Sequence, residues 1–213
     1  MAEKEYVTYG KKSGCGCGCG MTGASQEITG CRFSLAPMTD RFVEVILGAI
    51  EKVDTSKVWK ATDKLSTVYR GKQIHVEDAL KATFVQAYQD GVHMTMEATF
   101  SKGCPGDTDA DFILKEDDIP VNEAAIKDIH FPVACKIALY PMGIENYMEH
   151  IATVVNHAID MGIYEGSSHY CTILNCDVQK LFEYFHDVNT YCGKELSHYI
   201  FEITCSVNSP TAE

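Results

Sequence analysis

The stretch CRFSLAPM at residues 31–38 decides the fold of this chain, because it occurs a second time as CKIALYPM at residues 135–142. The offset between these two stretches is 104 residues. Two further blocks repeat at an offset of 105, namely HMTMEATFS at 93–101 as HYIFEITCS at 198–206, and STV at 66–68 as CTI at 171–173. Three blocks in the same order at a nearly constant offset predict an internal duplication.

Each copy shows the same succession of strand and helix patterns. In the first copy, a strand pattern at 31–36 ends at Pro37, which has no N–H to donate to a neighbouring strand. There follow a helical pattern from about Asp40, strand patterns at 58–60 and 65–69, a helical pattern that ends at Asp90-Gly91, and a strand at 92–101. This β-α-β-β-α-β order is the ferredoxin-like arrangement. The sequence therefore predicts an α+β fold, a tandem duplication of a ferredoxin-like unit with antiparallel sheets and helices on one face.

Apolar residues at helical spacing predict which side of the first helix is buried in each copy. In the first copy this stripe is Phe42, Val45, Ile46, Ala49, Ile50 and Val53. In the second copy it is Tyr147, Ile151, Val154, Val155 and Ile159. We also expect the side chain of Asp177 to cap the N-terminus of the last helix.

Composition divides the chain into four segments and excludes some classes of function. We expect a flexible tail containing Gly and Cys at 1–30, a first repeat at 31–106, an acidic connector at 107–130 and a second repeat at 131–213. No apolar run reaches the roughly 18 residues of a membrane span and the N-terminus has no hydrophobic signal, so we expect a cytoplasmic protein without membrane insertion. The net charge of −12, without a basic stripe, argues against a nucleic-acid partner.

Three short motifs have both a chemical and a structural interpretation. The carboxylates of Asp107–Asp111 alternate as in a calcium loop, but the run lacks the glycine and the distal glutamate of an EF-hand. The thiols of Cys15–Cys19 are spaced too closely for a usual zinc site, and without a secretory signal we expect all ten cysteines to be reduced. Cys104 could be the nucleophile of a thiol enzyme, but Pro105-Gly106 beside it is typical of a simple turn. We expect no catalytic residue, no metal site and no cofactor.

Polar side chains recur on the strands of both copies. Glu97 and Thr99 share one side of a strand, and they recur as Glu202 and Thr204. Such a row could line a pocket with hydrogen-bonding groups, or it could be a solvated sheet face. Ser34 and Thr67 lie on the two central strands of a ferredoxin-like sheet, where a hydroxyl either binds a ligand or serves as a strand former.

The motifs also resemble those of the YkoF family of thiamin/hydroxymethylpyrimidine-binding proteins, over about residues 30 to 210. The resemblance in the first half rests on RFSLAPMTD (32–40), DTSKVW (54–59), TD (62–63), ST (66–67), RG (70–71) and TFSKGCPGDT (99–108). In the second half it rests on ALYPM (138–142), Gly166 to His169-Tyr170, and NSP (208–210). It implies a dimeric, non-enzymatic protein that binds thiamin through its pyrimidine, one molecule per repeat. It also implies uptake or salvage of the pyrimidine precursor beside an ABC-type transporter.

From this resemblance and from strand parity, we expect the ligand to contact hydroxyl, carboxylate and soft apolar side chains. The expected contacts are Ser34, Met38, Trp59, Asp63, Thr67, Glu97, Thr99, Met142, Thr172, Glu202 and Thr204. Ala138 replaces Ser34 and Ile200 replaces Thr95 in the second copy, so we expect the second site to bind more weakly.

Two questions about function stay open at the level of the sequence. The first is whether a homodimer forms; we expect one, because a sheet covered on one face leaves the other to be packed. The second is the class of function, because the fold would also suit a regulatory module that senses another small metabolite.

Overall fold

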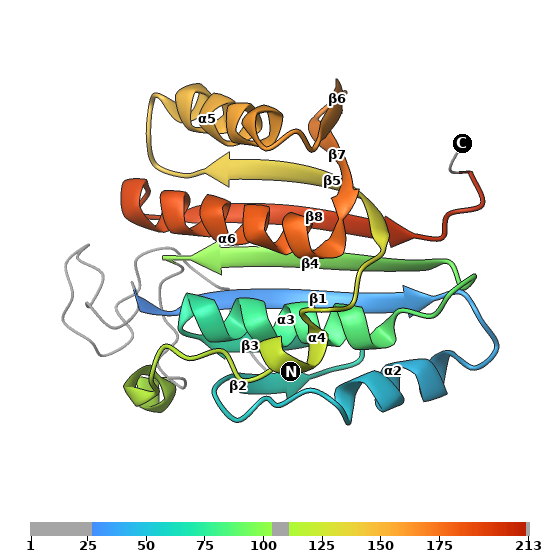
Figure 1. The fold of residues 1–213 in the computed structure, drawn as a ribbon. Helices are drawn as coiled ribbons and strands as arrows, with labels where there is room; N and C mark the ends of the chain where they lie inside the picture. The colour runs from blue at the N-terminus through green and yellow to red at the C-terminus, as the bar shows by residue number, and fades with distance from the viewer. Residues whose placement is uncertain (1–26, 104–110, 212–213) are drawn as a thin grey trace, which may run out of the picture.

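The computed structural model describes residues 27–103 and 111–211, and it confirms the predicted duplicated ferredoxin-like fold (Figure 1). The strands of the first repeat are β1 (Thr29–Pro37), β2 (Trp59–Thr62), β3 (Thr67–Gly71) and β4 (Met94–Lys102). Those of the second are β5 (Pro132–Pro141), β6 (Tyr164–Ser168), β7 (Cys171–Asp177) and β8 (Tyr199–Val207). The helices are α2 (Phe42–Ile50), α3 (Gln73–Ala87), α4 (Glu123–Ile126), α5 (Tyr147–Asp160) and α6 (Val178–Glu195), with a 3-10 turn η1 (Asp111–Lys115).

The two repeats join edge to edge into one sheet of eight antiparallel strands, in the order β2-β3-β1-β4-β8-β5-β7-β6. At the junction, β4 pairs with β8, and Ala98 lies opposite Ile203. These two residues are equivalent in the duplication, so a pseudo-two-fold axis passes between them. The repeated blocks predicted each repeat, but the pairing of β4 with β8 that merges the two sheets was not predicted.

One hydrophobic core lies between this sheet and the helices, which cover the face toward the viewer in Figure 1. Met96 of β4 and Phe201 of β8 are completely buried, as are Phe84 of α3 and Phe185 of α6. The rings of Phe185 and Phe201 pack edge to face with their centroids 5.9 Å apart. Both repeats therefore contribute to a single core, and none of the described helices covers the opposite face of the sheet, which we call the open face.

The predicted stripes on the first helix of each repeat are only partly correct. Val45, Ala49 and Val154 are buried as expected. Four members at the margins of the stripes are exposed instead: Phe42, Ile50, Tyr147 and Ile159. The reason is that α2 and α5 lie at the two ends of the helical layer, where each has a helical neighbour on one side only (Figure 1).

Polar contacts fix the connector and the last helix. Asn122 of the connector donates from Nδ2 to Asp78 of α3 (2.8 Å) and to the carbonyl oxygen of Asp54 (2.9 Å). The side chain of Asp177 accepts from the N–H of Gln179 (2.9 Å), which confirms the predicted N-cap of α6. Across the described ranges, the helices are too short or too polar to cross a bilayer.

Candidate functional site

The central strand of each repeat extends past its neighbour at the same position. The β1–β3 ladder ends with the pair Phe33 and Thr67, although β1 continues to Pro37. The β5–β7 ladder ends with the equivalent pair, Ile137 and Thr172, although β5 continues to residue 141. We call these unpaired ends, residues 34–37 and 138–141, the notches of the first and second repeat. Within the described chain, the backbone N–H and C=O groups of these residues that point away from β4 or β8 have no strand partner. They can therefore form hydrogen bonds to a ligand.

The register of the strands assigns the predicted residues to the two faces of the sheet. Thr67 and Thr172 share the helix face with their partners Phe33 and Ile137. Ser34 lies one residue past the last pair of its ladder, so it faces the open side, opposite Glu97. Strands β1 and β3 are adjacent as expected, but the hydroxyls of Ser34 and Thr67 point to opposite faces.

A cavity of about 710 Å³ lies on the helix face of the second notch, between α5 and strands β5 to β7. Its wall is mainly apolar, with Tyr147, Ile151 and Val154 contributed by α5. Thr172, only 8% exposed, supplies a hydroxyl, and Ser167 supplies another. A mainly apolar wall with a few polar groups is typical of sites for small molecules, and the volume lies in their usual range.

The first notch has the same strand geometry but a different wall. Helix α2 begins with Phe42, four residues after Met38, and α5 begins with Tyr147, five residues after Met142; with 9 and 14 residues, the two helices differ in length mainly at their C-terminal ends. The Thr67 hydroxyl lies 3.0 Å from the hydroxyl of Thr62 on β2. Met38, which follows the notch, is 60% exposed. Met38 and its equivalent Met142 are held in the same way. The backbone N–H of each donates to the carbonyl oxygen of the residue just before the adjacent strand in the sheet, β4 or β8.

A second hollow, of about 400 Å³, lies on the open face over the pseudo-two-fold axis. Four predicted residues line it together: Glu97, Thr99, Glu202 and Thr204. Glu97 lies opposite Thr204, and Thr99 lies opposite Glu202, so the rows of the two copies meet in one hollow. Strand parity identified this row correctly. Only the pairing of β4 with β8 shows that the copies share it.

The side chains that line this hollow carry more negative than positive charge, because its two carboxylates outnumber its one Lys or Arg. Glu202 raises the pKa of the Tyr140 phenol above its ordinary value, because a nearby negative charge disfavours the tyrosinate. In the described part of the chain, neither Glu97 nor Glu202 forms an ion pair. Lys136 is the one Lys or Arg side chain among the residues that line the hollow. Sequence reasoning missed Lys136 and Tyr140, although both lie in the repeated block at 135–142.

The first repeat uses its equivalent charges differently. Arg32, the equivalent of Lys136, donates to the carboxylate of Asp63 (2.9 Å) and to the hydroxyl of Ser66. Asp63 also accepts from the N–H groups of Leu65 and Ser66 in the β2–β3 turn. The hydrogen bond from Arg32, followed by these two, lowers the pKa of Asp63 to about 2. Asp63 therefore serves the turn and Arg32, and it is less available to a ligand than Glu97.

Trp59 lies away from both notches. It pairs with Arg70 across β2 and β3, and the Arg70 guanidinium lies 5.3 Å from the centre of its ring. Its ring packs beside Ile28 and Ile113 of the connector region. The structure does not bring Trp59 together with the other expected contacts.

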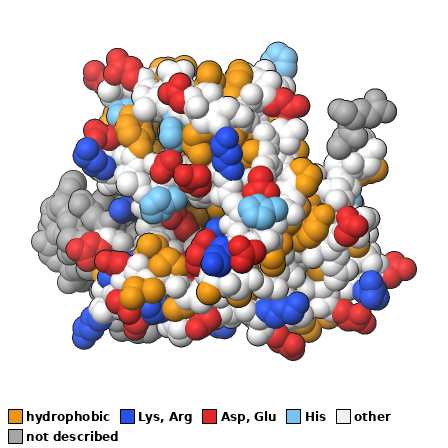
Figure 2. Space-filling model, in the orientation of Figure 1, with side chains coloured by type: hydrophobic (Ala, Val, Ile, Leu, Met, Phe, Trp, Pro, Cys, Tyr) orange, Lys and Arg blue, Asp and Glu red, His pale blue; other side chains and the backbone are white. Residues whose placement is uncertain are grey.

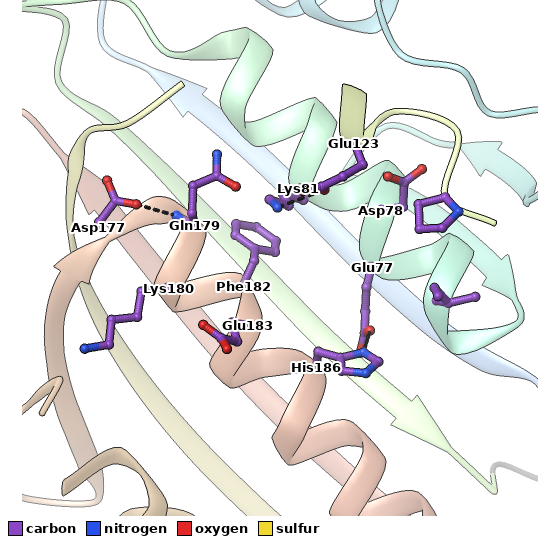
Figure 3. Close-up of a pocket in the computed structure, with 12 residues that line it drawn as sticks. Glu77, Asp78, Lys81, Glu123, Asp177, Gln179, Lys180, Phe182, Glu183 and His186 are labelled. Carbon is purple, nitrogen blue, oxygen red and sulfur yellow. Dashed lines mark hydrogen bonds and ion pairs between the residues drawn. The ribbon is translucent and has the colours of Figure 1, made fainter. Parts of the chain in front are cut away.

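A third cavity, of about 650 Å³, lies between α3 and α6 and contains none of the predicted residues (Figure 3). Figure 2 shows acidic, basic and histidine side chains gathered over this part of the helical layer. The Nδ1 of His186 on α6 lies 2.7 Å from the carboxylate of Glu77 on α3, and this contact raises the pKa of His186. Glu77 also accepts from Asn189 (2.9 Å), and Lys81 pairs with Glu123 (3.0 Å). These charges are largely paired with one another, so this region joins the two repeats.

The sequence motifs considered for thiol chemistry or metal binding lie outside the described residues. These motifs are Cys15–Cys19, Cys104 and the side chains of Asp107–Asp111. Burial raises the pKa of Cys176 to about 11 and that of Cys192 to about 12, which disfavours their reactive thiolate forms. Among the described residues, no group of three His, Cys, Asp or Glu side chains is arranged to hold a metal ion.

Comparison with known proteins relates the duplicated halves to one family. A family model described as the YKOF-related family matches residues 28–107 and 132–212. The chain is 41% identical over 187 residues to the "Putative HMP/thiamine-binding protein YkoF" of Bacillus subtilis (strain 168). This match covers 88% of the chain and 94% of the relative. Both matches span the two notches.

Proposed function

The chain belongs to the YkoF-related family, and from this premise we propose that it binds thiamin or its hydroxymethylpyrimidine moiety without transforming it, at one site per repeat. The observation that carries the proposal is the notch that recurs in both repeats, with Thr67 or Thr172 on its last strand pair. The printed name of the Bacillus subtilis relative supports the class of ligand.

The chemistry of the second notch suits an aminopyrimidine. The flat ring would lie against the apolar wall that includes Tyr147 and Ile151. The hydroxyl of Thr172 can donate and accept, and the free backbone groups of residues 138–141 can meet the ring edge. In the first repeat, Thr67 and the backbone of residues 34–37 would act in the same way, with Met38 as a soft contact at the rim.

Isothermal titration with thiamin and with hydroxymethylpyrimidine tests this function. We expect the wild-type chain to bind two molecules. Thr172→Val should weaken the second site and Thr67→Val the first, each by about tenfold, because a hydroxyl that bonds the ligand is lost. Thr153→Val, on the exposed side of α5, is the matched control and should change neither site. Absence of binding by the wild type, or unchanged binding by both notch variants, would sink the proposal.

We further propose that the chain works in the cytoplasm as a homodimer, in uptake or salvage of the thiamin precursor beside an ABC-type transporter. The homodimer is supported by the open face, which no described helix covers; a partner would pack on the part of this face outside the open-face hollow. Light scattering should then give twice the chain mass of 23.6 kDa. A strain lacking the protein should grow poorly when the pyrimidine precursor is scarce, and normal growth would contradict the role in salvage.

A further inference from the structure

The helix-face cavity and the open-face hollow adjoin at the second notch. Five residues line both of them: Ile137, Ala138, Tyr140, Tyr170 and Cys171. Ile137 belongs to the last pair of the β5–β7 ladder and the other four lie just beyond it, so strand pairing no longer separates the two faces there. A ligand in the cavity can therefore extend around the free edge of β5 into the hollow.

The two spaces favour different chemical groups. The cavity is mainly apolar and offers hydroxyls, which suits a neutral aromatic ring. The hollow places Glu202 directly across from Ala138, with Glu97 as its diagonal neighbour on the adjacent strand. Tyr140 and Tyr170 add aromatic rings at the border of the two spaces. The two carboxylates outnumber Lys136, the one Lys or Arg side chain in the lining, and carboxylates next to aromatic rings stabilise an organic cation.

We propose that the open-face hollow is a cation subsite of the second repeat, which receives the positively charged ring of a two-ring ligand whose neutral ring lies in the cavity. This inference rests on the proposed function and names the preferred ligand. The second site selects thiamin, with its thiazolium cation, over the neutral hydroxymethylpyrimidine. It disfavours phosphate esters, because a phosphate would bring negative charge close to Glu202 and Glu97.

The first repeat lacks the features on which this selection depends. Ala36 stands at the position of Tyr140, and Leu65 at the position of Tyr170. In the first repeat the carboxylate of Asp63 is already paired with the guanidinium of Arg32 at 2.9 Å, so it is not available to a cation of the ligand. The first site should therefore bind thiamin and hydroxymethylpyrimidine with similar affinities.

Titration of the two ligands separately against Glu202→Gln tests the subsite. We expect the affinity of one site for thiamin to fall about tenfold, because one charge-assisted interaction is lost. The affinity for hydroxymethylpyrimidine should change less than about twofold, since this ligand carries no charge to meet Glu202. Glu183→Gln, which removes an exposed carboxylate from α6, is the matched control and should leave both affinities unchanged.

A second variant keeps the test decisive if Glu202→Gln folds poorly. Tyr140→Ala gives the second repeat the residue that the first repeat already tolerates at Ala36, and it should reduce the preference for thiamin. The subsite is wrong if thiamin binding survives both changes, or if both ligands weaken equally; the proposed function then still stands. If the wild type binds neither ligand, the proposed function itself fails.

Discussion

The two repeats have the same strand order and the same notch, yet they surround it with different side chains. In the first repeat, α2 has 9 residues and Arg32 forms an ion pair with Asp63. In the second repeat, α5 has 14 residues and contributes Tyr147 to the wall of the cavity, and Tyr140 borders a hollow with two carboxylates. Duplication thus preserved the backbone frame, because the core requires it, while side chains and helix length around the notch diverged.

The shared core gives the largest expected effect in this comparison. Phe185→Ala in the second repeat should lower the free energy of unfolding by about 3–5 kcal/mol, because it removes a completely buried ring. Trp59, the one tryptophan, lies in the first repeat, so its fluorescence reports unfolding there. We expect the Trp59 transition in urea to shift as far as the circular dichroism transition. A Trp59 signal that stays at its wild-type midpoint would mean that the repeats unfold independently.

Tyr147, in the wall of the cavity at the second notch, gives the next largest effect, which is on ligand affinity. Tyr147→Ala should weaken the second site by about fivefold, or about 1 kcal/mol, because the ligand loses an aromatic contact. Tyr147 lines the cavity of the second notch, so the first site should be unchanged. Met148→Ala, the exposed neighbour on the same turn, serves as the control in the titration. Equal weakening of both sites by Tyr147→Ala would show that this wall does not distinguish them.

The hydroxyl at the edge of the notch is a smaller difference between the repeats. We predict that this hydroxyl by itself favours the first site, because Ala138 stands where the first repeat has Ser34. Ala138→Ser should strengthen the second site about threefold, and Ser34→Ala should weaken the first by a similar factor, since one hydrogen bond is gained or lost. Unchanged affinities in both variants would contradict this prediction.

The contact between α3 and α6, which joins the two repeats, gives the smallest effect, a change in stability that depends on pH. Glu77 raises the pKa of His186 above 6.5, so the charged pair forms more readily in the folded chain than in the unfolded one. Its contribution to stability is complete below pH 6.5 and is lost as the pH rises through the higher folded pKa. The His186 side chain is 50% exposed, so we expect less than about 1 kcal/mol. His186→Gln should flatten the dependence of the unfolding free energy on pH in this range, whereas the control His169→Gln on the exposed β6–β7 turn should not.

Sequence reasoning located most of the candidate site but not its geometry. Thr67, Thr172, Glu97 and Glu202 lie around the notches, whereas Trp59 lies at the connector. Parity along one strand assigns alternate residues to alternate faces, so it predicted the row of Glu97 and Thr99 correctly. It cannot show the register between two strands, and it therefore missed that Ser34 and Thr67 lie on opposite faces.

The sequence by itself determined the duplication, which the repeated blocks show directly, and the order of strands and helices and the alternation along β4 and β8, which depend on residues close together in the chain. Only the tertiary structure decided that β4 pairs with β8, that Arg32 turns toward Asp63, and that the two carboxylate rows share one hollow. These features depend on contacts between distant segments. Many edge pairings satisfy the same local pattern, and the joint packing of both repeats on one core selects among them.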